Sequence, residues 1–213
     1  MVTDLAVVFD LGGVLVEWDV TPAVAGLMDA AAWERAAAEL DFPGLNALSD
    51  AGRPYAETIA QVERRHADRP DLVAAYRHYV EHVGLSFPGP VPGTTAVVED
   101  LLAAGVRVLG LTNWSAETVH HSWRAAPVVA RFEGLVVSGA EGVTKPDPRL
   151  YRILLDRYAL DPARTVYVDD RADNVDAARA LGMLGVVFTD AAALRADLAA
   201  LGLPVAPGGE HRA

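Results

Sequence analysis

The sequence contains no cysteine among its 213 residues. Disulfide bonds, thiolate metal sites and cysteine nucleophiles are therefore excluded. It also lacks any run of the ~18 apolar residues that a membrane span requires, although 52% of its residues are hydrophobic. The opening residues Met1–Asp4 include no basic segment of the kind that begins a secretory signal. We therefore expect a globular protein of the cytoplasm that has no membrane partner.

Basic charge is scarce as well, because 18 Lys and Arg residues face 29 Asp and Glu residues, giving a formal net charge of −11. Nucleic acids and anionic membranes bind basic surfaces, so neither is expected as a partner. Lysine is almost absent, and Lys145 is the only one. In a sequence so biased toward arginine, a lone lysine indicates a position that needs a compact ammonium. The alternative is that one lysine occurs there by chance.

The first informative stretch is the apolar run Leu5–Phe9, which is followed by Asp10, Gly12 and Gly13. Five consecutive apolar residues predict a strand that is buried on both faces, as in a parallel sheet. Asp10 then lies at the carboxyl end of the strand, where open α/β sheets bind ligands. The two glycines allow backbone N–H groups to approach an anion. The alternative role for Asp10 is to cap a turn.

Residues 17–92 have the pattern of helices and show no strand, so we expect a helical insertion there. Helices are predicted over 23–40, 54–67 and 71–83, with Asp41–Gly44 ending the first, and 84–93 is expected to be a return hinge. From Thr94 onward, helices alternate with strands, which is typical of a parallel sheet. The helices are predicted at 94–104, 116–126, 148–158, 174–181 and 191–201, and the strands at 106–112, 135–138, 165–169 and 185–188.

These patterns predict an α/β protein with a Rossmann-like, doubly wound parallel sheet and an inserted helical cap. The sheet domain comprises residues 1–16 and 93–203, and the cap comprises residues 17–92. Residues 204–213 have no apolar period and are expected to form a loose tail.

Polar residues follow four of the predicted strands: Asp10, then Thr112 and Asn113, then Lys145, then Asp169 and Asp170. Parallel strands bring their carboxyl ends to one edge of the sheet, so these groups should meet in one cleft. Adjacent carboxylates repel each other unless a cation neutralises them. Mg²⁺ suits such oxygen ligands, so we expect a magnesium site there. The alternative for the Asp169–Asp170 pair is a helix N-cap.

Taken in order, four segments of the sequence resemble the motifs of the haloacid dehalogenase superfamily of hydrolases. They are Phe9–Val14, Leu111–Asn113, Lys145–Pro146 and Val168–Asp170 with Asn174 following. Within that superfamily, the chain is most similar to bacterial glucose-1-phosphate phosphatases and to the N-terminal domain of soluble epoxide hydrolases. The resemblance implies a C1-type cap.

The resemblance also implies site residues and a Mg²⁺-dependent phosphatase reaction on a small phosphorylated metabolite. Asp10 is the implied nucleophile, which forms an aspartyl phosphate. Lys145 pairs with it, and Thr112 and Asn113 provide hydrogen bonds. Phosphate would be held by Gly12, Gly13, Thr112, Asn113 and Lys145, and Mg²⁺ by Asp10, the backbone carbonyl of Gly12, Asp169 (directly or through water) and Asp170. The chain is expected to be a monomer or a homodimer.

One position departs from the superfamily's phosphatases, which usually carry an acid two residues after the nucleophile. Here that residue is Gly12. The loss of general-acid catalysis costs roughly a hundredfold or more in rate, so sugar 1-phosphates, acyl phosphates and other good leaving groups are the favoured substrates. A 2-haloacid dehalogenase is the rival function, because it uses the same nucleophile and needs neither acid nor metal. A third possibility is a member that binds a phosphorylated ligand with little turnover.

Substrate choice is expected to depend on the cap. The segment 46–54 is predicted to be a loop that faces the site, with Asp50 and Arg53 as candidate substrate contacts. Trp18 and Trp114 follow two of the motifs and either wall the pocket or pack in the core. Tyr151 is expected to pack on a helix face rather than to take part in catalysis.

Overall fold

A computed structural model describes residues 4–206 of the chain. Its centre is a sheet of parallel strands in the order β3-β2-β1-β4-β5. The strands are β1 (Ala6–Phe9), β2 (Arg107–Thr112), β3 (Gly134–Val137), β4 (Thr165–Asp169) and β5 (Leu184–Val187). The first strand of the sequence is thus the middle strand of the sheet, and it pairs with β2 on one side and β4 on the other.

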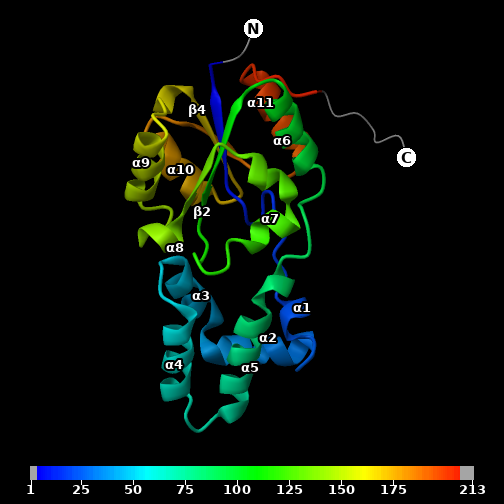
Figure 1. The fold of residues 1–213 in the computed structure, drawn as a ribbon, viewed down its shortest axis with the longest axis vertical. Coiled ribbons are helices and arrows are strands. Elements are labelled where there is room, and N and C mark those ends of the chain that lie inside the picture. The colour runs from blue at the N-terminus through cyan, green and yellow to red at the C-terminus, as the bar shows by residue number, and fades with distance from the viewer. Residues whose placement is uncertain (1–3, 207–213) are drawn as a thin grey trace, which may run out of the picture.

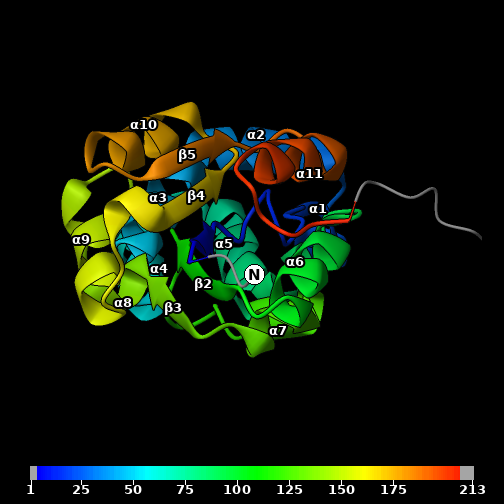
Figure 2. The same cartoon turned by 90° about the horizontal axis from the view of Figure 1, so that it is seen from above.

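Helices cover both faces of this sheet, as the doubly wound pattern predicted (Figure 2). The covering helices are α6 (Thr94–Ala103), α9 (Pro148–Arg157), α10 (Ala172–Ala180) and α11 (Ala191–Ala200). Alternate residues of β1 belong to different cores, because successive side chains of a strand point to opposite faces. Val7 and Phe9 lie in the apolar cluster that includes residues of α6 and α11, whereas Ala6 and Val8 lie in the cluster that includes residues of α9 and α10.

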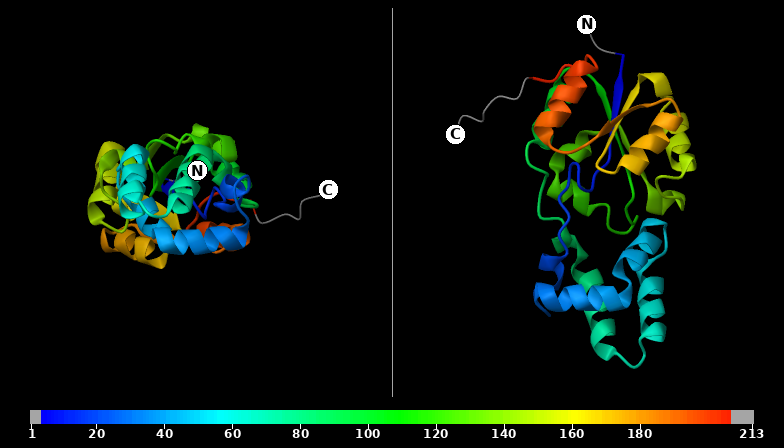
Figure 3. Two further views of the ribbon diagram at one scale, coloured as in Figure 1. Left: turned by 90° about the horizontal axis from the view of Figure 1, so that it is seen from below. Right: turned by 180° about the vertical axis from the view of Figure 1, so that it is seen from behind.

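The helical segment between β1 and α6 lies beyond the carboxyl ends of the strands (Figures 1 and 3). Its elements are α1 (Thr21–Val24), α2 (Ala30–Leu40), α3 (Phe42–Asp50), α4 (Tyr55–Arg65), α5 (Pro70–His82) and the 3₁₀ helix η1 (Val83–Ser86). Its two connections to the sheet run side by side, since Glu17 N donates to Gly89 O at 3.0 Å and Val91 N donates to Leu15 O at 3.1 Å.

One predicted helix and one predicted loop in this segment were wrong. The helix predicted at 23–40 is broken after α1, and α2 restarts at Ala30, where the Asp29 carboxylate accepts a hydrogen bond from Ala32 N at 2.8 Å. The segment Asp41–Gly44 was expected to end a helix and lead into a loop. It ends α2 at Leu40, but α3 begins at once with Pro43 in its first turn, where proline is tolerated. Residues 46–50, predicted as part of a loop, are therefore helical.

The sheet domain differs from prediction at one main place. The helix predicted at 116–126 is reduced to α7 (His121–Ala125). The preceding residues form turns, in which Ser115 Oγ accepts a hydrogen bond from Glu117 N at 3.2 Å and so replaces a helical backbone bond. The pattern also missed α8 (Ser138–Glu141) and the 3₁₀ helices η2 (Pro127–Arg131) and η3 (Pro162–Arg164).

No helix within residues 4–206 is both long and apolar enough to cross a membrane. Residues 207–213 of the predicted tail lie outside the described residues.

Candidate active site

A cavity of about 630 Å³ lies at the carboxyl ends of the central strands, and residues of the helical segment contribute to its lining. Its lining includes six of the residues predicted for the site: Asp10, Gly12, Gly13, Asn113, Lys145 and Asp170. The convergence follows from the sheet order, because β1 lies between β2 and β4 and all the strands are parallel. Sequence positions more than a hundred residues apart therefore meet in one place.

Lys145 lies between two carboxylates at the floor of this cavity. Its Nζ is 3.0 Å from Asp10 Oδ1 and 2.7 Å from Asp169 Oδ2, and it also donates to the Leu111 carbonyl at 3.2 Å. The Lys145 side chain is 1% exposed. Burial lowers the pKa of Lys145, but the carboxylates of Asp10 and Asp169 outweigh it and hold the pKa above its usual value. The lysine therefore carries its charge in the folded protein.

The Asp10 carboxylate is fixed by one of its two oxygens. Oδ1 accepts hydrogen bonds from Leu11 N at 2.7 Å and ion-pairs with Lys145. Burial raises the pKa of Asp10 to about 6; the ammonium of Lys145 opposes this shift and the charge of Asp169 adds to it. Asp10 is therefore ionised at neutral pH, and within the described residues no hydrogen bond to Oδ2 is found.

Asp169 is held on all sides by donors. Tyr167 OH donates to Oδ2 at 2.5 Å, Asn174 Nδ2 donates to Oδ1 at 3.0 Å, and Arg171 N donates to Oδ1 at 2.9 Å. The sequence reasoning did not single out Tyr167. The signal was present, because residues two apart in a strand share a face, and Tyr167 precedes Asp169 by two positions in β4.

Three carboxylates at the site form a donor set that fits a hard divalent cation. Asp10, Asp169 and Asp170 each offer an oxygen, and these oxygens lie within 4.8 Å of one another. Three negative charges face the single ammonium of Lys145, so the cluster has an excess of negative charge that Mg²⁺ would balance. The backbone supports the fit, because a Cβ built on Gly13 would lie only 2.7 Å from Asp170 Oδ2. Only glycine, here with φ +75°, lets this turn approach the carboxylate.

Asn113 makes side-chain hydrogen bonds, whereas the hydroxyl of Thr112 makes none within the described residues. Asn113 makes a reciprocal pair with the backbone of Lys145: its Nδ2 donates to Lys145 O at 3.0 Å, and its Oδ1 accepts from Lys145 N at 2.8 Å. This pair fixes the backbone that carries the ammonium. Thr112 is 1% exposed, and its buried Oγ1 has no hydrogen-bond partner within the described residues. The Thr112 hydroxyl is therefore a buried polar group without a protein partner in the described part of the chain, and Thr112 is not among the residues that line the cavity.

Of the other residues considered as substrate contacts, some line the cavity and one does not. Asp50, Trp18 and Trp114 line the cavity. Arg53 is not among the residues that line it, and its Nη1 donates instead to Gln61 Oε1 at 2.7 Å. Tyr151 is fully buried against Tyr167, and its hydroxyl donates to Asn174 O at 2.8 Å, in line with the packing role expected for it.

Comparison with known proteins places this geometry in context. The family model described as haloacid dehalogenase-like hydrolase matches residues 5–182. The chain is 29% identical over 208 residues to the sesquiterpene phosphatase astK of Aspergillus oryzae, an alignment that covers 91% of this chain and 94% of that protein. It is 38% identical over 64 residues to flavin mononucleotide hydrolase 1 of Arabidopsis thaliana, covering 30% of this chain and 26% of that protein.

Solved structures show the same fold. An enzyme of the same superfamily from Bacteroides thetaiotaomicron, in complex with magnesium and inorganic phosphate, superposes with a TM-score of 0.69 at 16% identity, covering 87% of this chain and 94% of that one. A dehalogenase superposes with a TM-score of 0.59 at 25% identity, covering 88% and 86%.

Proposed function

The chain belongs to the haloacid dehalogenase-like hydrolases, and on this premise we propose that it is a Mg²⁺-dependent phosphatase of a small phosphorylated metabolite. One observation carries the proposal: the carboxylates of Asp10, Asp169 and Asp170 converge beside the ammonium of Lys145. A cluster of this composition suits phosphoryl transfer, where cations neutralise the phosphate oxygens. The phosphatase and hydrolase functions named for two relatives support the same reaction class.

Asp10 is the proposed nucleophile, and the reaction has two steps. In the first, Asp10 Oδ2 attacks phosphorus, the bond to the leaving oxygen breaks, and an aspartyl phosphate forms. In the second, water attacks phosphorus and releases Asp10 and inorganic phosphate. Lys145 orients the nucleophile through its contact with Oδ1 and offsets the charge of the phosphoryl oxygens. Asn113 keeps Lys145 in position through its two backbone hydrogen bonds.

The cradle for the phosphoryl group is built from the turn after β1. We assign to it the backbone N–H of Gly12, because the N–H of Gly13 already donates to Val16 O at 2.9 Å. The Thr112 hydroxyl, which has no partner within the described residues, is a further proposed donor, although Thr112 is not among the residues that line the cavity. Mg²⁺ would be held by Asp10, the Gly12 carbonyl, Asp169 and Asp170, and when bound it supplies Lewis-acid stabilisation of the phosphate oxygens. Asp169 is already saturated by donors, so Asp10 and Asp170 are the proposed principal ligands.

The helical segment is proposed to act as a cap over this site. We assign residues 17–92 to the cap and residues 1–16 and 93–203 to the catalytic core. Residues of both line the same cavity, which supports substrate contacts from each. A cap that excludes water strengthens every electrostatic interaction at the phosphorus.

A 2-haloacid dehalogenase is the second candidate, favoured by the fold shared with a dehalogenase and by the absence of an acid at Gly12. The carboxylates of Asp169 and Asp170 argue against it, because they would repel the carboxylate of a haloacid.

Assays of phosphate release and of halide release distinguish the phosphatase from the dehalogenase. We would assay phosphate release from acetyl phosphate, p-nitrophenyl phosphate and glucose phosphates with Mg²⁺ and with EDTA, and halide release from 2-chloropropionate. Phosphate release that depends on Mg²⁺ is the expected result. Halide release without metal would establish the dehalogenase instead. The release of neither product would favour a family member that only binds a phosphorylated ligand.

A further inference from the structure

The cavity has a polar floor and a largely apolar wall. The floor holds Asp10, Lys145 and Asp170. The wall includes six aromatic or aliphatic side chains from the helical segment and from the loop after β2: Trp18, Tyr55, Tyr79, Val83, Phe87 and Trp114. The volume of about 630 Å³ is larger than a phosphate needs, so the cavity has room for an organic group beside this wall.

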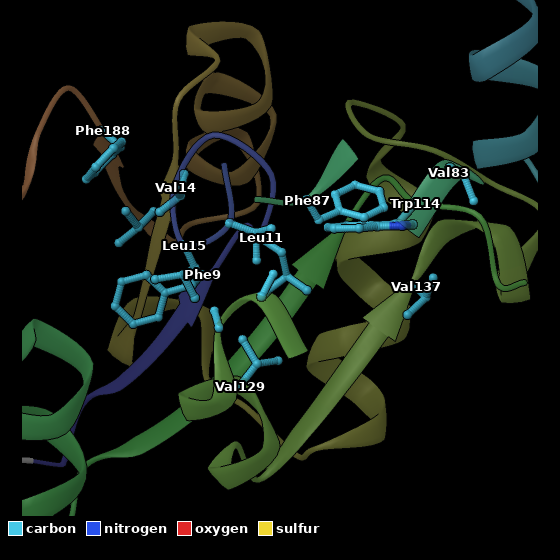
Figure 4. Close-up of a cluster of buried hydrophobic side chains, with 14 of the residues drawn as sticks. Phe9, Leu11, Val14, Leu15, Val83, Phe87, Trp114, Val129, Val137 and Phe188 are labelled. Atoms are coloured by element: carbon cyan, nitrogen blue, oxygen red, sulfur yellow. The ribbon is translucent and has the colours of Figure 1, made fainter. Parts of the chain in front are cut away.

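Packing behind the wall holds it in place. Phe87 lies against Trp114 with ring centroids 4.5 Å apart, and Figure 4 shows the two rings one over the other. Elsewhere on the wall, Trp18 and Tyr79 both pack on Phe42, at centroid distances of 6.5 and 4.8 Å. Aromatic side chains locked by their neighbours offer a preorganised apolar surface, which loses little entropy when a ligand binds.

The wall also offers few charged groups to a substrate. Among the lining residues that the helical segment contributes, Asp50 is the one charged group and none is basic. On the floor, Lys145 is engaged by two carboxylates, and the Arg171 guanidinium is paired with Asp173. Both cations that line the cavity are thus already paired, and a second anionic group on the substrate would have to be desolvated without a partner, which is unfavourable.

We propose that the substrate is the phosphate monoester of an apolar alcohol, whose hydrocarbon part fills the space between Trp18 and the Phe87–Trp114 pair. This inference rests on the proposed phosphatase function and narrows it. It departs from the sugar phosphates that the motifs alone favoured.

A series of n-alkyl phosphates tests the proposal, because ethyl, butyl, hexyl and octyl phosphate share one leaving-group chemistry and differ in apolar surface. We expect kcat/KM to rise by roughly threefold or more per added methylene pair until the cavity is filled, and octyl phosphate to exceed glucose 1-phosphate and glucose 6-phosphate. A flat series, or glucose phosphates turned over faster than octyl phosphate, would overturn it.

Trp18→Ala and Trp123→Ala form a matched pair, since the two side chains are similarly exposed, at 51% and 48%, and only Trp18 lines the cavity. Trp18→Ala should lower kcat/KM for octyl phosphate far more than for ethyl phosphate, and Trp123→Ala should change neither. Equal losses on both substrates in Trp18→Ala would contradict the assignment.

Binding of alkyl phosphates to the Asp10→Asn variant tests the apolar site without requiring turnover, so this inference can be judged apart from the proposed function. Tryptophan fluorescence reports binding because Trp18 and Trp114 line the cavity. If the wild-type protein releases no phosphate from any substrate, the phosphatase proposal fails. Tighter binding of octyl than of ethyl phosphate would then still support the apolar site, and equal binding would reject it.

A second, independent observation concerns Asp50, the last residue of α3. Its carboxyl lines the cavity, is partly buried, and accepts hydrogen bonds from Asn46 Nδ2 at 3.3 Å and from the Ser115 backbone. Its backbone carbonyl accepts from Ser138 Oγ at 2.6 Å. These contacts join the end of α3 to the loop after β2 and to the start of α8, so Asp50 is held in place at the cavity.

Asp50 differs from the other carboxyls of the cavity because it is outside the three-carboxylate cluster. Burial raises the pKa of Asp50 to about 7, the charge of Asp10 adds to the shift, and Lys145 opposes it. Tyr55 and Tyr79 also face it, and both have pKa values above the usual one because of burial. A substantial share of Asp50 is therefore protonated near neutral pH.

We infer that Asp50 is the proton donor to the leaving oxygen, the role for which Gly12 has no side chain. As the bond from Asp10 Oδ2 to phosphorus forms and the bond to the leaving oxygen breaks, the Asp50 proton moves to that oxygen. In the second step the Asp50 carboxylate accepts a proton from the attacking water and is restored. Apolar alcohols are poor leaving groups, so their esters need such a donor.

Leaving-group dependence tests this role. Asp50→Asn should lower kcat on octyl phosphate by roughly a hundredfold and lower it much less on p-nitrophenyl phosphate, whose leaving group departs without a proton. Asp68→Asn, at an exposed acid elsewhere in the helical segment, is the control and should change neither. Equal losses on both substrates in Asp50→Asn would show that Asp50 only supports the structure, and no loss on either would also reject the role.

Discussion

The ammonium of Lys145 lies 3.0 Å from the carboxylate of Asp10, with 1% of the lysine side chain and 10% of the aspartate side chain exposed. A buried pair of this kind is stabilised only while both members are present, because either charge alone is costly to bury. Each partner can therefore be tested by removing it.

Replacement of Asp10 by Asn should abolish turnover and leave the fold intact. The amide keeps the shape of the carboxylate and an acceptor oxygen for Leu11 N, but it cannot form an aspartyl phosphate. Phosphate release and circular dichroism measure the two effects. Residual activity near that of the wild type would remove Asp10 from the nucleophile's role.

Replacement of Lys145 by Met should lower both activity and stability. It leaves the buried carboxylates of Asp10 and Asp169 without their cation, at a cost of about 3–5 kcal/mol. Chemical denaturation measures the loss. Lys145→Arg is the matched variant: it keeps the charge, and the site that holds a compact ammonium has little room for a guanidinium, so it should recover only part of the stability. Full activity in Lys145→Met would contradict the proposed mechanism.

Metal addition should stabilise the protein apart from any effect on turnover. Mg²⁺ would relieve repulsion among Asp10, Asp169 and Asp170, so Tm should rise with Mg²⁺ and fall back with EDTA. Asp170→Asn should reduce the rise in Tm. Asp173→Asn is a nearby control, because that carboxylate is paired with Arg171. An unchanged Tm across a magnesium titration would argue against the site.

Gly12→Asp should restore an acid two residues after the nucleophile. A Cβ at Gly12 meets nothing within 4 Å, so the side chain has room to enter the cavity. We expect higher kcat on alkyl phosphates, by on the order of tenfold or more, and recovery of activity in an Asp50→Asn background. Gly13→Ala is the contrasting variant, since its Cβ would clash with Asp170 and its φ of +75° disfavours alanine, and it should lose activity. If Gly12→Asp lowers kcat on every substrate, the hypothesis that the site lacks a general acid at position 12 is contradicted.

Asp50 should also make stability depend on pH. Its pKa is about 7 in the folded protein and near 3.9 in an unfolded chain, so the folded state binds more protons between those values. Stability contributed by its protonated form is complete below pH 4 and is lost as pH rises through 7. Asp50→Asn should therefore gain stability relative to wild type as pH rises from 4 to 7, by at most about 4 kcal/mol, and stay constant above. A gain that is equal at all pH values would exclude titration of Asp50 as its cause.

The parts of the site that depend on strand ends were predictable from the sequence. The continuous apolar run before Asp10 predicts a buried strand, and the parallel order of the sheet brings Asp10, Lys145, Asp169 and Asp170 together by geometry alone. Strand alternation would have pointed to Tyr167 as well, had it been applied beside Asp169.

Other parts depend on contacts between distant residues, which local patterns do not contain. Pro43 and Gly44 favoured a break, yet α3 forms because proline is tolerated in a first helical turn and Phe42 packs on Trp33 and Tyr79. Arg53 donates a hydrogen bond to Gln61 and is not among the residues that line the cavity. The direction of its side chain depends on the fold of the helical segment, which the local sequence does not contain.

The central position of β1 also governs how the protein can fold. Ala6 pairs with Arg107 on one side and with Thr165 on the other, so β1 is fully paired only after two segments far along the chain have joined it. Contacts between residues so far apart in the chain form slowly, because loop closure must precede them. Until β4 joins the sheet, the unpaired edge of β1 remains open to aggregation or to chaperones.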